Sequence, residues 1–384
     1  MRHSRRIMAA AMSATVALAL AGCGVQSTGG GESTGEPGKT VTVFISADTN
    51  VQDLWQKGLI PAFQKANPGY TVKVDFDLHG THDQQTVAKL TAATVQDKDP
   101  GMDLIDGGFV AQLSASGLLA DATKTQLANL KDVPQSILDT ATPNAIPYRA
   151  SSVLLAYNGK EVTEPPKTLD ELLAWIKANP GKFAYNSAGT GGSGDAFITT
   201  VLDKTIPEAE RAKMVTDYVP ELEKLWDPGL ATLKELNPYV YQKGVYPNGN
   251  NGTLELLSSG QIWMAPVWSD MFVSGVASGQ IPADTKTTQI TDPSFTGGAS
   301  FLGIPKASKN VEAAQTLVNW VLTPEAQEII STQVSGYPVI ELSLLSKSIQ
   351  DKFKDADIAN LRPPYFSQMS ADMAKMWTEK VPGN

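Results

Sequence analysis

Residues 41–76 read VTVFISADTNVQDLWQKGLIPAFQKANPGYTVKVDF and predict a strand, a helix and a second strand. Residues 41–45 are a short run rich in β-branched side chains, which favours a strand. The apolar residues between Leu54 and Phe63 recur at helical spacing, and an Asn-Pro-Gly turn ends that helix. Residues 71–76 return to the strand pattern. Strands that alternate with helices in this way predict an α/β fold, with helices on both faces of the sheets.

The same alternation continues along the chain. Residues 86–95 and 311–321 predict helices, and residues 102–105 predict a buried strand. Thr323 and Pro324 suit the N-cap and the first position of a further helix. These elements extend the α/β pattern over most of the sequence.

Two extended segments, residues 146–158 and residues 295–305, predict chain crossings between two lobes. A helix with strong start signals follows the first crossing. Thr168 and Glu171 form a capping-box pattern there, in which the two side chains accept backbone N–H groups at the helix start. We therefore expect two lobes joined by segments that pass between them.

The N-terminus predicts export. Three arginines lie among the first six residues, and residues 7–20 are almost entirely apolar. Such a pattern is typical of a secretory signal peptide, here residues 1–22, and the apolar run is too short for a membrane span. The signal is followed by Cys23, the only cysteine, so neither a disulfide framework nor a cysteine metal site is expected. Leu-Ala-Gly-Cys at this place resembles the lipobox of bacterial lipoproteins, which implies lipidation of Cys23. Residues 23–40 are rich in Gly, Ser and Thr and predict a flexible tether.

The composition argues against several classes of function. The net charge of −9 gives no basic footprint for nucleic acid. No Gly-x-Ser-x-Gly motif is present, and His79 and His82 lack the spacing of a metalloprotease helix. Asp75, Asp77 and Asp83 lie close to these histidines in sequence, so a metal site stays open, although a polar loop at the edge of a cleft is the preferred interpretation. We expect no catalysis and no cofactor.

A glycine run is the most conspicuous loop. Residues 189–194 read GTGGSG without the Gly-Lys-Ser/Thr of a phosphate-binding loop. Glycines let the backbone approach a ligand closely, and an open α/β sheet binds ligands beyond its strand ends. We expect a ligand-facing loop, with Ser193 capping the next helix and Asp195 accepting hydrogen bonds from the ligand. An ordinary flexible connection is the alternative.

Aromatic and polar residues at other predicted strand ends and crossings suit the same cleft, because small-molecule pockets combine flat apolar walls with a few placed polar groups. Residues 262–270 read as a strand that ends in a loop, with Trp263 in the core and Trp268 in the cleft. The predicted ligand-binding residues are Asp48, Asp106, Tyr148, Arg149, Tyr185, Asn186, Ser193, Asp195, Asn248, Trp268, Asp270 and Thr296.

Several short motifs, taken in order, resemble those of the extracellular solute-binding proteins of ABC importers, family 1, which have the type II periplasmic-binding fold. The motifs are the lipobox and tether, FQKANPG at 63–69 before VKV at 72–74, MDLI at 102–105, PKTLDEL at 166–172, AA at 313–314 followed by PEAQ at 324–327, and GYPV at 336–339. The resemblance covers most of the chain after the signal peptide.

The resemblance implies two α/β lobes, each built from discontinuous chain, with a ligand cleft between them. We expect residues 41–148 plus 302–340 in the first lobe and residues 149–298 in the second, with residues 341–384 forming a helical segment that packs across both. It also implies a monomer outside the cytoplasm that is held to the membrane by its lipid anchor. Its partners would be a small-molecule ligand and the permease subunits of an ABC transporter.

The ligand is less well specified. Within the family, GSGDAF at 192–197 resembles a branch assigned to thiamine-type transport. Asp106, Asp195 and Asp270 opposite Trp268 suit an organic cation, such as a thiamine-like compound or a polyamine, through carboxylate pairing and cation–π contact. The same residue types also suit a carbohydrate.

Two further possibilities rank lower. One is an Fe(III)-binding receptor, which Tyr239 and Tyr241 suggest because such receptors bind iron through tyrosines. The other is an extracellular enzyme on this scaffold, which would need a convergent set of acid, base and nucleophile that the sequence does not offer.

Overall fold

The computed structural model describes residues 39–122, 126–354 and 361–382 of the 384-residue chain. The predicted signal peptide, the lipidation site at Cys23 and the tether up to residue 38 lie outside the described residues. Within these ranges, no helix combines the length and the apolar character that a membrane crossing requires.

Seven strands form one sheet in the order β2-β1-β3-β7-β4-β5, with β6 also paired to β4. β1 pairs in parallel with β2 and β3, whereas β7 and the partners of β4 are antiparallel. The strands are β1 (Thr40–Ala47), β2 (Thr71–Leu78), β3 (Leu104–Gly107), β4 (Ile146–Asn158), β5 (Met264–Trp268), β6 (Thr285–Thr288) and β7 (Gly297–Gly303).

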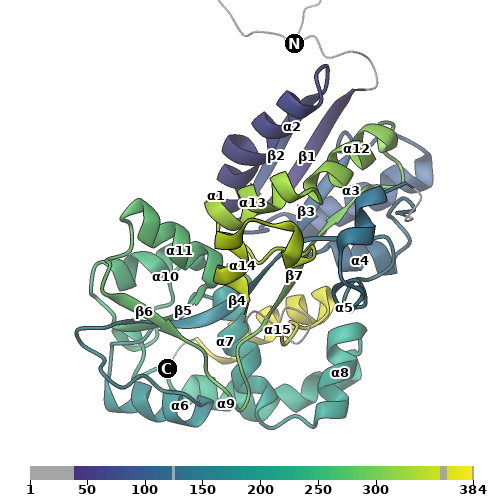
Figure 1. Cartoon of the computed structure of the whole chain (residues 1–384). Coiled ribbons are helices and arrows are strands. Elements are labelled where there is room, and N and C mark those ends of the chain that lie inside the picture. The colour runs from purple at the N-terminus through teal and green to yellow at the C-terminus, as the bar shows by residue number, and fades with distance from the viewer. Residues whose placement is uncertain (1–38, 123–125, 355–360, 383–384) are drawn as a thin grey trace, which may run out of the picture. The chain divides into compact units, whose positions relative to one another are not determined.

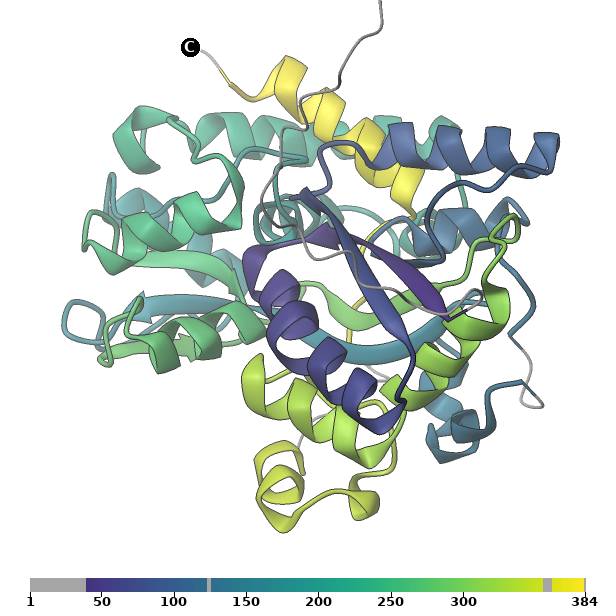
Figure 2. The ribbon, with the colours of Figure 1, turned by 90° about the horizontal axis from the view of Figure 1, so that it is seen from above.

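Helices pack around this sheet (Figures 1 and 2). The α-helices are α1 (Thr49–Asp53), α2 (Ile60–Ala66), α3 (Asp83–Gln96), α4 (Val110–Ala115), α5 (Gln135–Leu138), α6 (Leu169–Ala178), α7 (Gly192–Asp203), α8 (Glu208–Thr216), α9 (Asp227–Glu235), α10 (Gly249–Ser258), α11 (Ser269–Ser278), α12 (Val311–Val321), α13 (Pro324–Gln333), α14 (Lys347–Phe353) and α15 (Ser367–Lys380). A π-helical turn, η1 (Leu54–Leu59), joins α1 to α2, and short 3-10 turns are η2 (Ala128–Asp132), η3 (Pro220–Trp226), η4 (Tyr241–Lys243) and η5 (Leu342–Leu344). The predicted α/β class is confirmed.

The long strand β4 makes the sheet continuous. Its first half pairs with β7, from Ile146 opposite Leu302 to Ser152 opposite Gly297, and its second half pairs with β5 and β6. The two segments predicted as extended crossings are therefore β4 and β7, and they run side by side (Figure 1).

Two large apolar cores lie along this sheet. One core takes its buried residues from positions 41–148 and 302–353, including Trp55 and Phe63. The other takes them from positions 153–295 and 365–381, including Phe197 and Trp377. Each core is built from separate stretches of chain, because β4 and β7 carry the backbone from one to the other.

Local start signals in the sequence position two helices. Thr168 accepts a hydrogen bond from the backbone N–H of Glu171 at the start of α6, and Thr323 accepts one from Ala326 at the start of α13. The carboxylate of Glu171 accepts the N–H of Lys167 rather than that of Thr168, so the reciprocal half of the capping box lies one residue earlier than predicted.

The C-terminal helix α15, yellow in Figure 2, contacts both α4 and α9. Met369, Met373 and Trp377 lie on its buried face and belong to the second core. The opposite side of its first turns remains available to line a cavity, which matters for the site described next.

Candidate functional site

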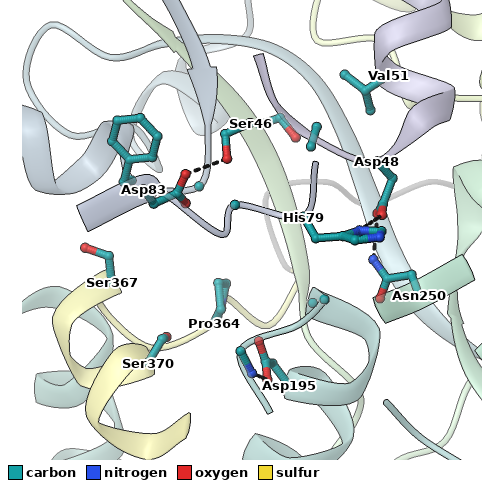
Figure 3. Close-up of a pocket in the computed structure, with 18 of the residues that line it drawn as sticks. Ser46, Asp48, Val51, His79, Asp83, Asp195, Asn250, Pro364, Ser367 and Ser370 are labelled. Atoms are coloured by element: carbon teal, nitrogen blue, oxygen red, sulfur yellow. Dashed lines mark hydrogen bonds and ion pairs between the residues drawn. The ribbon is translucent and has the colours of Figure 1, made fainter. Parts of the chain in front are cut away.

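A cavity of about 570 Å³ lies where several strands end and helices begin. Its walls come from the end of β1, the turn after β2, the starts of α1, α3, α7, α10 and α11, the end of β5, and α15. This volume is in the range of small-molecule sites, and the position beyond strand ends is where open α/β sheets bind ligands. Figure 3 shows the cavity with its lining side chains.

One wall carries a chain of short polar contacts that begins with the pair of His79 and Asp48. The ring Nδ1 of His79 lies 2.6 Å from Asp48 Oδ1, and Asp48 Oδ2 accepts a hydrogen bond of 2.6 Å from Asn250 Nδ2 (Figure 3). Asn250 Oδ1 in turn accepts the backbone N–H and the hydroxyl of Ser193, at 3.1 and 2.7 Å. The hydrogen bond to Asp48 raises the pKa of His79 above its usual value of 6.5. The chain thus joins the end of β1 to the starts of α10 and α7.

Behind the cavity lies a buried carboxylate. Asp106 is 2 % exposed, and its Oδ2 accepts hydrogen bonds from Trp55 Nε1 at 2.8 Å and from the Tyr148 hydroxyl at 2.6 Å. The register of β4 against β7 shifts at Tyr148, between Pro147 and Arg149. Such an irregularity re-aims side chains, and here both Tyr148 and Arg149 turn toward Asp106. Burial raises the pKa of Asp106.

Arg149 connects this buried group to the cavity. Its Nε donates to the Tyr148 hydroxyl at 2.7 Å, and its Nη1 donates to Asp270 Oδ2 at 3.4 Å. Asn50 Nδ2 also donates to Asp270 Oδ2, at 3.3 Å. Arg149, Asp270 and Asn50 all line the cavity, so its floor is a buried ion pair with an amide beside it.

Two other lining carboxylates have no basic partner among the residues that the structure describes. Asp83, at the start of α3, accepts only the Ser46 hydroxyl, at 2.5 Å. Asp195, in the first turn of α7, accepts only the backbone N–H of Gly189, at 2.9 Å. Burial raises the pKa of Asp83 to about 6 and that of Asp195 to about 7. Neither carboxylate makes a side-chain cap to its own helix.

The remaining walls are less polar. Trp268, at the end of β5, lines the cavity, and its ring lies close to the backbone of Gly192 at the start of α7. The contribution of α15 is small residues: Ser367, Ser370, Ala371 and Ala374. The cavity therefore combines three aromatic residues, Trp268, Phe109 and Tyr365, with several carboxylates.

Five of the predicted ligand-binding residues line the cavity: Asp48, Arg149, Asp195, Trp268 and Asp270. Six others, namely Asp106, Tyr148, Tyr185, Asn186, Ser193 and Thr296, are buried outside its lining. Asn248 is exposed at the N-cap position of α10 and also does not line it. Their roles in binding stay predictions, and several of them support lining residues from behind.

The structure corrects two local predictions. Gly191, and not Ser193 as predicted, occupies the N-cap position of α7, and the amide oxygen of Asn250, from another helix, accepts the N–H of Ser193. No loop follows β5, because α11 begins at Ser269 directly after Trp268 and places Asp270 in its first turn.

Tyr185 shows why an aromatic residue near a predicted loop need not reach the cavity. It is fully buried and packs against Phe197, Tyr246 and Trp377. Trp263 is half-buried against the second core, with Lys182 Nζ 4.7 Å from the centre of its ring. The apolar core therefore took up Tyr185, which the sequence pattern had assigned to the ligand, and Trp263 packs against that core as predicted.

Sequence reasoning placed the loop containing His79 and Asp83 at the edge of a cleft, and both residues line the cavity. It missed Ser46, Asn50 and the whole contribution of α15. The only signal for α15 was the recurrence of Ser367, Ser370, Ala371 and Ala374 at spacings of three and four, which places small residues on one helix face. In the described part of the chain, no group of three or more His, Cys, Asp or Glu side chains could hold a metal ion.

Comparison with known proteins gives one family match and many structural ones. The family described as bacterial extracellular solute-binding protein matches residues 58–357. Protein YnjB of Escherichia coli is 27 % identical over 44 % of this chain and 43 % of its own length. A maltooligosaccharide ABC transporter solute-binding lipoprotein of Streptococcus pneumoniae is 25 % identical over 68 % of this chain and 66 % of its own length. The chain thus spans less than two thirds of the length of these curated relatives.

Solved structures share the fold. Maltose-bound MalE3 of T. maritima has a TM-score of 0.66 at 14 % identity, covering 89 % of this chain and 95 % of that one. A Listeria monocytogenes protein assigned to spermidine/putrescine ABC transport has a TM-score of 0.64 at 16 % identity, covering 89 % and 98 %. At these identities the similarity shows the two-lobed α/β fold and does not extend to the ligand.

Proposed function

Because this chain belongs to the bacterial extracellular solute-binding protein family, we propose that it captures a small organic cation outside the cytoplasm and delivers it to the permease of an ABC importer. The family and the fold are those of transport proteins that carry out no catalysis. The class of ligand is the part of the proposal that the cavity itself must support.

The observation that carries the cation proposal is the charge of the cavity wall. Asp48, Asp83, Asp195 and Asp270 line it, and the lining bases are Arg149 and His79. Carboxylates in a partly desolvated pocket attract a positive charge far more strongly than they would in water. Trp268 adds an aromatic face of the kind that binds ammonium and heteroaromatic cations. A thiamine-like compound or a polyamine has the required chemistry.

A thermal-shift screen followed by calorimetry tests this function. Spermidine, putrescine and thiamine represent the cations, maltose and a monosaccharide represent the sugars, and ferric citrate represents the metals. We expect at least one cation to raise the melting temperature and to bind with a stoichiometry of one. Stabilisation by a sugar, with no response to any cation, would refute the cation proposal while leaving the transport class intact.

A carbohydrate is the second candidate, and Trp268 is the observation that favours it. Sugars bind by stacking on an aromatic face while amides and carboxylates accept hydrogen bonds from their hydroxyls, and Trp268, Asn250 and Asp195 line the same cavity. The maltooligosaccharide and maltose-binding relatives bind such ligands. Two unpaired carboxylates are, however, a costly way to hold a neutral ligand.

The location follows from the N-terminal prediction. We propose that cleavage after residue 22 leaves Cys23 lipidated, so that residues 23–40 tether a monomeric receptor to the outer face of the cytoplasmic membrane. The relative from Streptococcus pneumoniae is itself described as a lipoprotein. Tethering keeps a receptor near its permease, which raises its effective concentration there.

We further propose that the lobes divide as the sequence predicted, with residues 41–148 and 302–340 in one and residues 149–298 in the other. On that division Asp48 and Asn250 belong to different lobes, as do Asn50 and Asp270, and each pair is hydrogen-bonded. Ligand contacts from both lobes would favour the closed arrangement of such a receptor.

A further inference from the structure

Two carboxylates of the cavity lack charged partners, and they differ in this from the other ionisable groups that line it. Asp48 pairs with His79 at 2.6 Å, and Asp270 pairs with Arg149 at 3.4 Å. Tyr365 also lines the cavity, and its hydroxyl donates to Asp203, which belongs to neither of these pairs. Within the described ranges Asp83 and Asp195 make no ion pair, so two negative charges are left without an ionic partner when all the acids ionise.

The surroundings of Asp83 supply no compensating charge. Ser46 donates its hydroxyl, and the nearest ionisable neighbours are Asp77 and His82. These two are already paired with each other, at 2.8 Å between Asp77 Oδ1 and His82 Nδ1. Asp77 disfavours and His82 favours the charged form of Asp83, and burial outweighs both, so that its pKa rises to about 6.

Asp195 is in a similar position on another wall. One backbone N–H, from Gly189, is its only hydrogen-bond donor among the described residues, and burial raises its pKa to about 7. Gly189, Ala374 and Ser370 surround this part of the cavity without offering a charge. Asp83 and Asp195 are both half-buried, and a carboxylate that is partly withdrawn from water without an ionic partner is unfavourable in its charged form unless a counter-charge neutralises it.

The two carboxylates come from different walls of one cavity. Asp83 lies at the start of α3 beside the end of β1, whereas Asp195 lies in the first turn of α7, and Figure 3 shows them on separate sides of the space that Ser367 and Pro364 also border. A ligand with two positive charges can pair with both groups, whereas a monocation supplies a single counter-charge.

On the basis of the proposed function, we propose that the ligand carries two positive charges, one bound by Asp83 and the other by Asp195. Two ammonium groups joined by an apolar chain have this chemistry, and the chain would run past the small residues of α15. A monocation such as thiamine satisfies only one of the two carboxylates. Binding also displaces the protons that the empty cavity holds on these carboxylates, because an ammonium group favours their ionised forms.

Calorimetry with linear diaminoalkanes of increasing length, each compared with the monoamine of equal length, tests the proposal on the full chain. We expect one length to bind best and about tenfold to a hundredfold more tightly than its monoamine, as a second charge-assisted contact would give. Titrations near pH 6.5, in two buffers that differ in ionisation enthalpy, should show protons released on binding.

Asp83→Asn and Asp195→Asn should each reduce the affinity for the best diamine to about that of the monoamine, and each should reduce proton release. Asp75→Asn is the matched control, since Asp75 is an exposed carboxylate on β2 that does not line the cavity. Should a variant fail to fold, the comparison of diamines with monoamines on the unaltered protein still tests the proposal.

The outcomes separate this inference from the proposed function. Monoamines or thiamine that bind as tightly as every diamine would overturn the two-charge inference while cation capture stands. If no amine binds at all and a sugar does, the cation function itself fails.

Discussion

Asn250 and Asp48, which lie 202 residues apart in the chain, are joined by a hydrogen bond of 2.6 Å between Asn250 Nδ2 and Asp48 Oδ2. The other side of the Asn250 amide caps α7 by accepting the N–H of Ser193. One buried side chain, 5 % exposed, therefore fixes the start of a helix and holds the end of β1 against it. The cavity wall between these two elements depends on that amide.

Asn250→Ala should lower the free energy of unfolding by about 1–3 kcal/mol, because it leaves Asp48 and the Ser193 N–H without their shared partner. The affinity for the ligand should fall as well, since the wall loses its connection to α10. Urea denaturation and calorimetry measure the two effects. Asn251→Ala is the control, because Asn251 lies on the same helix and does not line the cavity. Equal effects of the two substitutions would refute this role of Asn250.

His79 makes the stability of this wall depend on pH. The hydrogen bond and charge of Asp48 raise the pKa of His79 above 6.5, with a further contribution from Asp77, so protonated His79 is favoured in the folded chain. A raised folded-state pKa gives a stabilisation that is complete below the unfolded pKa of about 6.5 and is lost as the pH rises through the folded value. The difference in unfolding free energy between the unaltered chain and His79→Gln should therefore shrink across that interval.

Comparing the two proteins at each pH removes the separate contribution of Asp83 and Asp195, which changes stability in the same direction as that of His79. Their pKa values are raised by burial, so both groups lower stability as the pH rises from about 4 to 7. His82→Gln serves as a control, since that ring is 61 % exposed. A difference between the unaltered chain and His79→Gln that stays constant from pH 5 to pH 9 would mean that folding does not raise the pKa of His79.

A substitution at Gly249 gives a second test of the contact between His79 and Asp48, because Gly249 lies against the Nε2 side of the His79 ring. It has φ 76°, and a Cβ at this position would lie 2.8 Å from His79 Nε2. Gly279 has nearly the same φ, 77°, with nothing within 4 Å of a Cβ. Gly279→Ala should cost about 1–2 kcal/mol for the left-handed backbone alone. Gly249→Ala should cost more and should also lower the pKa of His79 by displacing its ring, which NMR titration measures. Identical effects in both variants would mean that the His79 ring moves aside freely.

The sequence predicted what local signals encode. The alternation of β-branched and helical runs indicated the α/β class, and Thr168 and Thr323 marked helix starts that the structure contains. Asp48, Asp195 and Asp270 were found because each follows a recognisable strand or glycine loop. In these cases the chemical reason for the feature lies within a few residues of it.

Features that depend on contacts between residues far apart in the sequence could not be predicted from local patterns. Asn250 caps a helix that begins 58 residues earlier, at Gly192, and no spacing rule connects the two. Tyr185 looked like a cleft residue until packing against Tyr246 and Trp377 placed it in the core. The shift of register at Tyr148, which brings Arg149 toward Asp106, arises only when β4 meets β7.

The lipid anchor can be tested apart from the fold. Cys23→Ser should move the protein from the membrane fraction to the soluble fraction without changing its melting temperature, because the apolar core begins at Val41. Fractionation and mass spectrometry of the N-terminus measure acylation, and thermal denaturation measures stability. Wild-type protein recovered soluble and unacylated from its native host would end the lipoprotein proposal.

Closure of the lobes is the remaining prediction. The links from Asp48 to Asn250 and from Asn50 to Asp270 join the two sides of the cavity without a ligand, at 2.6 and 3.3 Å. A ligand that contacts both sides adds to these links, so it should shift a population of open molecules toward the closed form. The cation selected by the thermal-shift screen should therefore lower the radius of gyration measured by small-angle scattering.

Asn250→Ala removes one of the two links and should leave more of the unliganded protein open. Its radius of gyration without ligand should then exceed that of the unaltered chain, and the decrease on saturation should be larger, because the closed end state is the same. The Asn251→Ala control should follow the unaltered chain. A radius that is equal in all three proteins, with and without ligand, would favour a rigid pocket in which Asn250 stabilises the wall and takes no part in a hinge motion.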